Sequence, residues 1–180
     1  MLIHPLAERL RALGLAAMAD IFLQMQADPA AADLPREDWL GLLLEREVTA
    51  RDNKRLSRRL SQARLRQNAV VEDTDFRAPR GLDRALFHTL ASCDWIRHSQ
   101  HLVISGPTGV GKSWLACALG HKACREGFPV LYRRAPRLFA ELAVARGEGR
   151  LPRVLATLER TRLLNHRRLG PRAAHCRAAA

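Results

Sequence analysis

The sequence predicts an α/β protein in which an all-helical N-terminal region precedes a parallel-sheet domain. Three observations support this fold class. Apolar residues recur at helical spacing through the first 75 residues, a glycine-rich loop separates a short apolar run from a helical segment, and strands alternate with helices after residue 100. With 180 residues, the chain can hold one domain, or one small domain and part of a second.

Residues 1–75 form the predicted helical region. Leu6, Leu10 and Leu13 repeat at helical spacing, Gly14 interrupts the pattern, and a second helix is expected over 16–26. Asp33 and Pro35 are start signals for a third helix. Its predicted apolar side consists of Trp39, Leu40, Leu43, Leu44 and Val48.

The same helix is strongly basic over residues 46–66, where Leu56, Leu60 and Ala63 keep an apolar stripe. Such a helix can lie along a phosphate backbone, although a solvated face explains any single cation equally well. The net charge of +12 favours a nucleic-acid partner. We predict sequence-independent contact with DNA phosphates, because no base-reading module is evident. The predicted contact residues are Arg51, Lys54, Arg55, Arg58 and Arg59.

Residues 106–113 read Gly-Pro-Thr-Gly-Val-Gly-Lys-Ser, the pattern of a phosphate-binding loop. An apolar run at 101–105, expected to be a strand, precedes the loop, and helical spacing over 114–125 follows it. Glycines let backbone N–H groups surround a triphosphate, and a helix N-terminus adds partial positive charge. A plain glycine turn is the alternative.

We predict an ATP and Mg²⁺ site at this loop. Lys112 is expected on the β- and γ-phosphates and Ser113 on Mg²⁺. The predicted nucleotide-binding residues are Gly106, Pro107, Thr108, Gly109, Val110, Gly111, Lys112, Ser113 and Trp114.

The elements around the loop follow from similar signals. Residues 70–81 are expected to be a linker, and Asp83 can cap a helix that carries Phe87. A second strand is expected over 129–133, followed by helices over 136–146 and 151–158. The four cysteines show no Cys-x-x-Cys spacing, which argues against a zinc or redox motif. The chain shows neither a spanning apolar run nor a signal peptide, so a cytoplasmic location is expected.

Several local patterns resemble a known family. They are Asp94-Trp95-Ile96, the loop followed by Trp114-Leu-Ala-Cys117-Ala, Glu47-Val-Thr-Ala-Arg-Asp-Asn53 and Arg80-Gly-Leu-Asp-Arg84. Over residues 1 to about 164 the chain resembles the IstB-type helper ATPases of bacterial insertion sequences. The resemblance implies a P-loop AAA+ domain that binds ATP, and a protein that oligomerises on DNA and helps a partner transposase select its target. DnaC-type helicase loaders share the phosphate loop and are an alternative.

The resemblance also predicts that the AAA+ domain, placed at residues 76–164, is incomplete. The family shows an apolar strand ending in paired aspartates and Trp-Gly just after residue 163. Here the chain reads Asn165-His166-Arg167-Arg168, and no Asp or Glu follows Glu159. Removing one base from a permitted back-translation near codon 165 restores Asp-Asp-Trp-Gly, so residues 165–180 are expected to be an out-of-frame tail.

Three expectations follow from this departure. First, the sequence offers no candidate for a catalytic residue. Second, the chain is expected to bind nucleotide without efficient hydrolysis; the alternative is that it acts only as a DNA-binding fragment. The third expectation concerns folding. The strands at 101–105 and 130 would also lack their shared neighbour. Their backbone groups would be unpaired, and the ATPase part would fold poorly.

Overall fold

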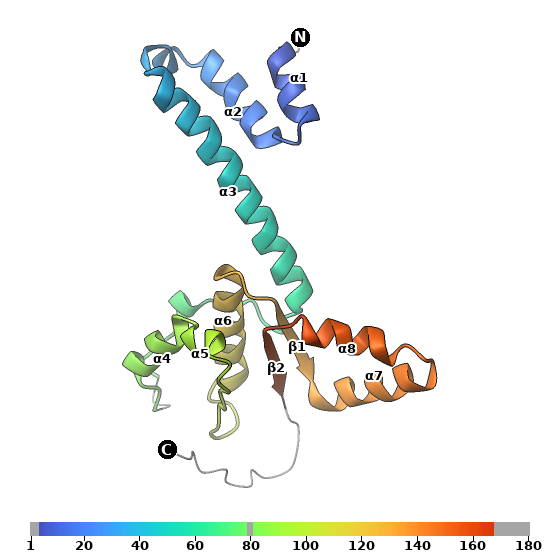
Figure 1. Cartoon of the computed structure of the whole chain (residues 1–180). Helices are drawn as coiled ribbons and strands as arrows, with labels where there is room; N and C mark the ends of the chain where they lie inside the picture. Colours follow the sequence, from blue (N-terminus) through green and yellow to red (C-terminus); the bar gives the residue numbers. More distant parts are fainter. Residues whose placement is uncertain (1–3, 79–80, 168–180) are drawn as a thin grey trace. The chain divides into compact units, whose positions relative to one another are not determined.

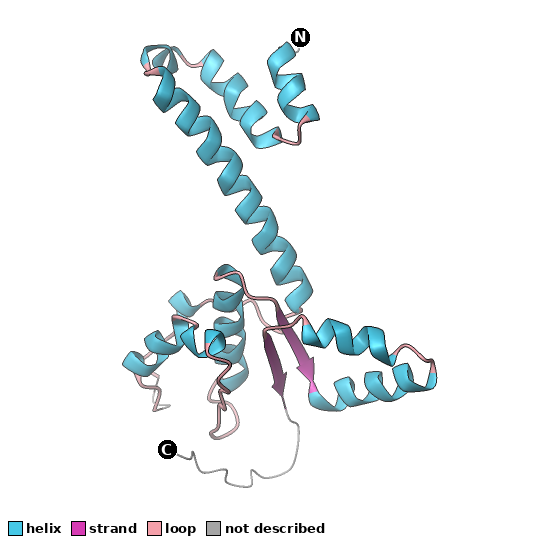
Figure 2. Cartoon of the chain, in the orientation of Figure 1, coloured by secondary structure: helices cyan, strands magenta, loops and turns pink. Residues whose placement is uncertain are grey.

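The computed structural model describes residues 4–78 and 81–167, and the chain divides into two compact units, Met1–Ser57 and Arg58–Ala180. The described part is mostly helical with one small parallel sheet, as the sequence predicts (Figures 1 and 2). None of the helices in these two ranges is long and apolar enough to cross a membrane.

The first unit contains α1 (Pro5–Ala12), α2 (Ala16–Ala27), the short 3-10 helix η1 (Pro29–Asp33) and most of α3 (Arg36–Ala63). Gly14 has φ +77°, a left-handed conformation that suits glycine and allows the turn between α1 and α2. Met18, Phe22, Met25 and Leu43 form the centre of the core. These helices confirm the expected helical region.

The buried side of α3 differs from the predicted apolar side. Leu43 and Glu47 are buried, whereas Leu40, Leu44 and Val48 are 51%, 52% and 57% exposed. The helix presents only a narrow stripe to the core, in which Leu43 packs with residues of α2 and Trp39 is partly buried. The predicted apolar side of α3 is therefore only partly buried.

The second unit begins in the last turns of α3 and carries the sheet. Its helices are η2 (Val71–Asp73), α4 (Arg84–Ala91), α5 (Asp94–Arg97), α6 (Lys112–Arg125), α7 (Ala135–Gly147) and α8 (Leu151–Glu159). The strands β1 (Val130–Arg134) and β2 (Leu163–Arg167) pair in parallel, with Val130 opposite Leu163. Since α7 and α8 connect the two strands, the unit has the crossover connection that a parallel pair needs (Figure 1). Asp83 caps α4 by accepting from the N–H of Ala85, as predicted.

Two strand predictions need correction. Residues 101–105 form no strand: Leu102 and Ile104 pack against the core around Phe87 and Leu115, but Val103 is 80% exposed. A strand needs a hydrogen-bonded neighbour, and none of the described residues pairs with this segment. Conversely, β1 does not lack a partner, because β2 pairs with it along five residues.

The predicted out-of-frame tail, residues 165–180, lies mostly outside the described residues. Only Asn165, His166 and Arg167 are described, and they form the end of β2. The pairing of β2 with β1 therefore includes residues that the sequence assigned to the tail.

Candidate functional site: the phosphate-binding loop

The glycine loop leads directly into α6. Gly106, Gly109 and Gly111 have φ values of +143°, +92° and +89°, which L side chains rarely adopt. Gly111 is the N-cap of α6, and no side chain caps this helix end. The first N–H groups of α6, which have no partner within the helix, are thus free of side-chain competition for an anion.

Lys112 is the first residue of α6, and its side chain folds back over the loop. Its Nζ donates to the carbonyl of Gly106 at 2.7 Å and also to the carbonyl of Pro107. The ammonium group is therefore held beside the glycine backbone, where bound phosphate oxygens could replace these two carbonyls as acceptors. Ser113 follows at the second helical position and is partly buried.

Trp114, the residue after Ser113, contacts the core of the second unit. Its side chain is partly buried and packs against two parts of the core, one around Cys117 and Tyr132 and the other around Phe87 and Leu115. We infer that Trp114 anchors the start of α6.

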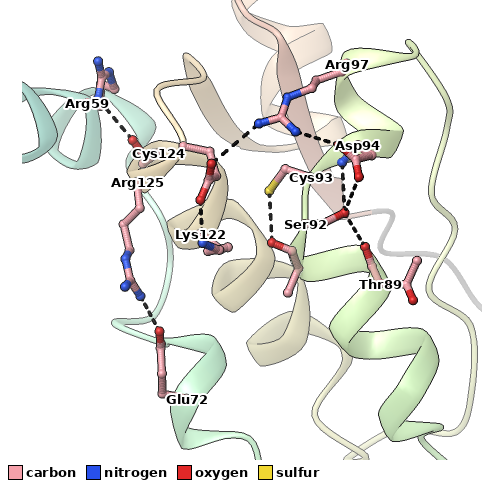
Figure 3. Close-up of polar contacts among 12 residues, drawn as sticks. Arg59, Glu72, Thr89, Ser92, Cys93, Asp94, Arg97, Lys122, Cys124 and Arg125 are labelled. Atoms are coloured by element: carbon pink, nitrogen blue, oxygen red, sulfur yellow. Dashed lines mark hydrogen bonds and ion pairs between the residues drawn. The ribbon is translucent and has the colours of Figure 1, made fainter.

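The other end of α6 is anchored by polar contacts (Figure 3). Arg125 pairs with Glu72 at 2.5 Å, and Lys122 pairs with Glu126 at the same distance. Arg59, on the last turns of α3, donates to the carbonyl of Cys124 at 3.3 Å. Burial raises the pKa of the Cys124 thiol to about 11, so this cysteine is a protonated core group at neutral pH.

The motif around Asp94 has a structural role. Asp94 accepts from Arg97 at 2.6 Å and from the hydroxyl of Ser92 at 2.9 Å (Figure 3). These two hydrogen bonds, Ser92 first, lower the pKa of Asp94. The indole of Trp95 donates to the carbonyl of Leu90 at 2.9 Å, and Ile96 is buried. The motif fixes the α4–α5 corner.

The five predicted DNA contacts differ in their surroundings. Arg51 donates to Glu47 at 2.8 Å, Arg55 lies 3.2 Å from Asp52, and Arg59 is engaged with Cys124. Lys54 and Arg58 are exposed, and neither makes an ion pair or side-chain hydrogen bond with the residues that the structure describes. Four positions apart on one helix, these two share a face.

Sequence reasoning did not give a role to two polar side chains that organise the fold. Glu47 is buried and accepts from the backbone N–H of Met18 at 3.1 Å, which caps the first turn of α2 from another helix. Asn165 donates to the carbonyl of Ala116 at 2.8 Å, joining β2 to α6. Both contacts link residues far apart in the sequence, so no local pattern indicates them.

A glycine loop that opens into a helix beside a parallel sheet defines the class of P-loop α/β proteins. The IstB-like ATP binding proteins match residues 8–172, and the chain belongs to this family.

Named relatives agree with this assignment. The chain is 53% identical over 164 residues to an insertion sequence ATP-binding protein, y4pL, of Sinorhizobium fredii, which covers 91% of this chain and 67% of the relative. It is 47% identical over 162 residues to the ATP-binding protein of insertion sequence IS1162 of Pseudomonas fluorescens, covering 89% and 70%. The chain thus spans about two thirds of the length of these relatives.

Proposed function

We propose that this chain is an ATP-binding helper of an insertion-sequence transposase, which binds nucleotide at residues 106–114 and DNA through α3. The observation that carries the proposal is the loop itself. Three glycines with positive φ lead into an uncapped helix end, and Lys112 is held across them. The names of the relatives, which refer to ATP and insertion sequences, support the same reading.

The residues present fit the phosphates of ATP better than they fit its metal ion. Backbone N–H groups and Lys112 supply donors for phosphate oxygens, whereas Ser113 supplies one hydroxyl for Mg²⁺. Within the described ranges no group of three His, Cys, Asp or Glu residues could hold a metal. Bound Mg²⁺ would neutralise phosphate charge, and this chain's own residues would mainly bind and orient the nucleotide.

We further propose that the chain hydrolyses ATP poorly. The end of β2 reads Asn165-His166-Arg167, so the strand that the family resemblance assigns to paired aspartates carries no carboxylate there. A water molecule beside the phosphates would then lack an acceptor for its proton. The purified chain should show no phosphate release above that of Lys112→Ala, with or without DNA. Sustained turnover abolished by Lys112→Ala would contradict this proposal.

The DNA contact is proposed to centre on Lys54 and Arg58. Arg51 and Arg59 contribute charge, but each also holds the fold through Glu47 or Cys124. The sharpest variant is therefore Lys54→Glu/Arg58→Glu, which leaves those contacts in place.

Fluorescence anisotropy with a labelled duplex, measured over a range of salt concentrations, tests this assignment. The slope of log K against log salt is negative, and each lost phosphate contact reduces its magnitude by about 0.9. The double variant should therefore have a slope about 2 smaller in magnitude. Arg9→Glu/Arg36→Glu makes the same charge change at two other exposed positions. Equal slopes for both variants would overturn the assignment.

The proposed protein partner is a transposase, and self-association on DNA is proposed with it. A helicase-loader role would require a replicative helicase as partner instead. The two roles can be separated by co-purification. The full chain is tested for retention of the transposase encoded beside its gene and, in parallel, of the host's replicative helicase. Retention of the helicase alone would favour the loader.

A further inference from the structure

The second unit contains a cleft where β1 leads into α7. It has a volume of about 590 Å³, within the range of small-ligand sites. None of the residues lining it belongs to the phosphate-binding loop or to the predicted DNA contacts on α3. Its charged lining, here called the arginine cleft, consists of Arg64, Arg66, Arg133, Arg134, Arg137 and Glu141.

The charges in the arginine cleft are unbalanced. Glu141 lies 3.5 Å from the Nε of Arg133 and 3.4 Å from the Nε of Arg137. Arg64, Arg66 and Arg134 make no ion pair with any residue in the described part of the chain. Five guanidinium groups therefore face one carboxylate, and three of them have no counterion from the described residues. Like charges gathered around an open cleft raise its positive potential, which favours an anion there.

The backbone adds to this positive potential. Arg134 is the N-cap of α7, and no side chain caps that helix end. Pro136, in the first turn, also lines the cleft. The N-terminus of a 13-residue helix thus borders the cleft with its partial positive charge.

The walls of the cleft are fixed by the fold. Tyr132 is only 7% exposed and packs against Cys117 and Ala118, and its carbonyl accepts from Arg133 at 3.2 Å. Arg64 has φ +51°, a left-handed conformation that turns the chain directly after α3. The arginines of the cleft thus come from three places: Arg64 and Arg66 from the turn after α3, Arg133 and Arg134 from β1, and Arg137 from α7.

We propose that the arginine cleft binds phosphate groups, as a second anion site separate from the phosphate-binding loop. Planar guanidinium forks suit phosphate oxygens, which accept two parallel hydrogen bonds from one arginine. The source of the phosphates is a nucleic-acid strand or a free polyphosphate. Both present the same chemistry to the cleft.

The test uses the full chain with Arg66→Gln/Arg134→Gln, which removes two cations without breaking an ion pair among the described residues. Arg153→Gln/Arg160→Gln removes the same charge from exposed positions at α8 and serves as the control. In the first arm, a labelled single-stranded 20-mer is titrated at several salt concentrations. If a nucleic-acid strand is the source, the magnitude of the negative slope should fall by about 1.4 in the cleft variant, at about 0.7 per contact, and stay unchanged in the control.

In the second arm, inorganic pyrophosphate is titrated by calorimetry into chains that also carry Lys112→Ala, so that the loop contributes little. If free polyphosphate is the source, the cleft variant should bind pyrophosphate at least tenfold more weakly than the control does. Arg66→Lys/Arg134→Lys keeps the charge but loses the planar fork. It should keep the salt slope of the control in the first arm and bind pyrophosphate with intermediate affinity in the second. If cleft and control variants behave alike in both arms while circular dichroism shows equal helicity, the proposal is overturned. Neither arm requires the loop to bind ATP, so this result is independent of the proposed function.

Discussion

At the residue scale, Glu47 shows how one side chain joins two helices. Oε2 accepts from the N–H of Met18 and Oε1 from the Nε of Arg51 at 2.8 Å. The hydrogen bond from Arg51, followed by that from Met18, lowers the pKa of Glu47 against the opposing effect of burial. Because Leu15, the N-cap of α2, offers no capping side chain, Glu47 supplies the cap from a distance.

This arrangement predicts an acid-sensitive first unit. A carboxylate whose folded pKa lies below its unfolded value of about 4.3 stabilises the fold above that value and loses its contribution as pH falls through the folded pKa. Thermal melts followed by circular dichroism should show the melting temperature of the full chain falling below about pH 4.5. Glu47→Gln should lower it at pH 7 and weaken this pH dependence. Glu45→Gln changes a neighbouring exposed carboxylate, and an equal effect there would contradict the assignment.

At the scale of elements, α6 is the part that holds the site in place. Seven of its residues are buried, and it begins at the loop, packs beside η2 and β1 and accepts a hydrogen bond from β2. Gly120 lies at the closest approach: a Cβ there would meet Leu65 at 3.1 Å and Val130 at 3.6 Å. A glycine at this point lets α6 lie close to Leu65, the tighter of the two contacts.

We therefore predict that Gly120→Leu destabilises the second unit by about 1–3 kcal/mol, the usual range for overpacking a filled core. Gly147→Leu is the matched control, because a Cβ at Gly147, in the last turn of α7, meets nothing within 4 Å. Urea denaturation of the two variants checks this. If the two variants were equally stable, the close packing at Gly120 would not restrict the size of the side chain there.

Comparison of elements also shows what could be predicted from sequence. The helix after the loop, the cap at Asp83 and the helices between the strands follow local signals, and all of them form. The strand at 101–105 has the right residues, but a strand depends on a neighbour that local spacing does not reveal. For the same reason the distant acceptor of Arg59 and the gathering of arginines around β1 could not be predicted.

At the scale of the whole molecule, two units carry two separate cores. The first packs around Phe22 and Leu43, and the second around α6. In the described part of the second unit the sheet has two strands, and Val103 is 80% exposed. Small sheets of this kind depend on helix packing for their stability.

Scanning calorimetry of the full chain should therefore resolve two transitions. ATP with Mg²⁺ should raise only the transition of the second unit, since a ligand at 100 times its Kd stabilises the unit that binds it by about 2.7 kcal/mol. A single cooperative transition that ATP shifts as a whole would contradict the prediction that the two units unfold independently.

The central claim is that an amide-lined loop with Lys112 binds the phosphates of ATP. Equilibrium dialysis of the full chain with labelled ATP and Mg²⁺ tests it most directly, with Lys122→Ala, at the other end of α6, as control. We predict that Lys112→Ala raises the Kd at least about tenfold, or about 1.4 kcal/mol, while Lys122→Ala leaves it near that of the parent. Equal affinity of Lys112→Ala and the parent would contradict the account.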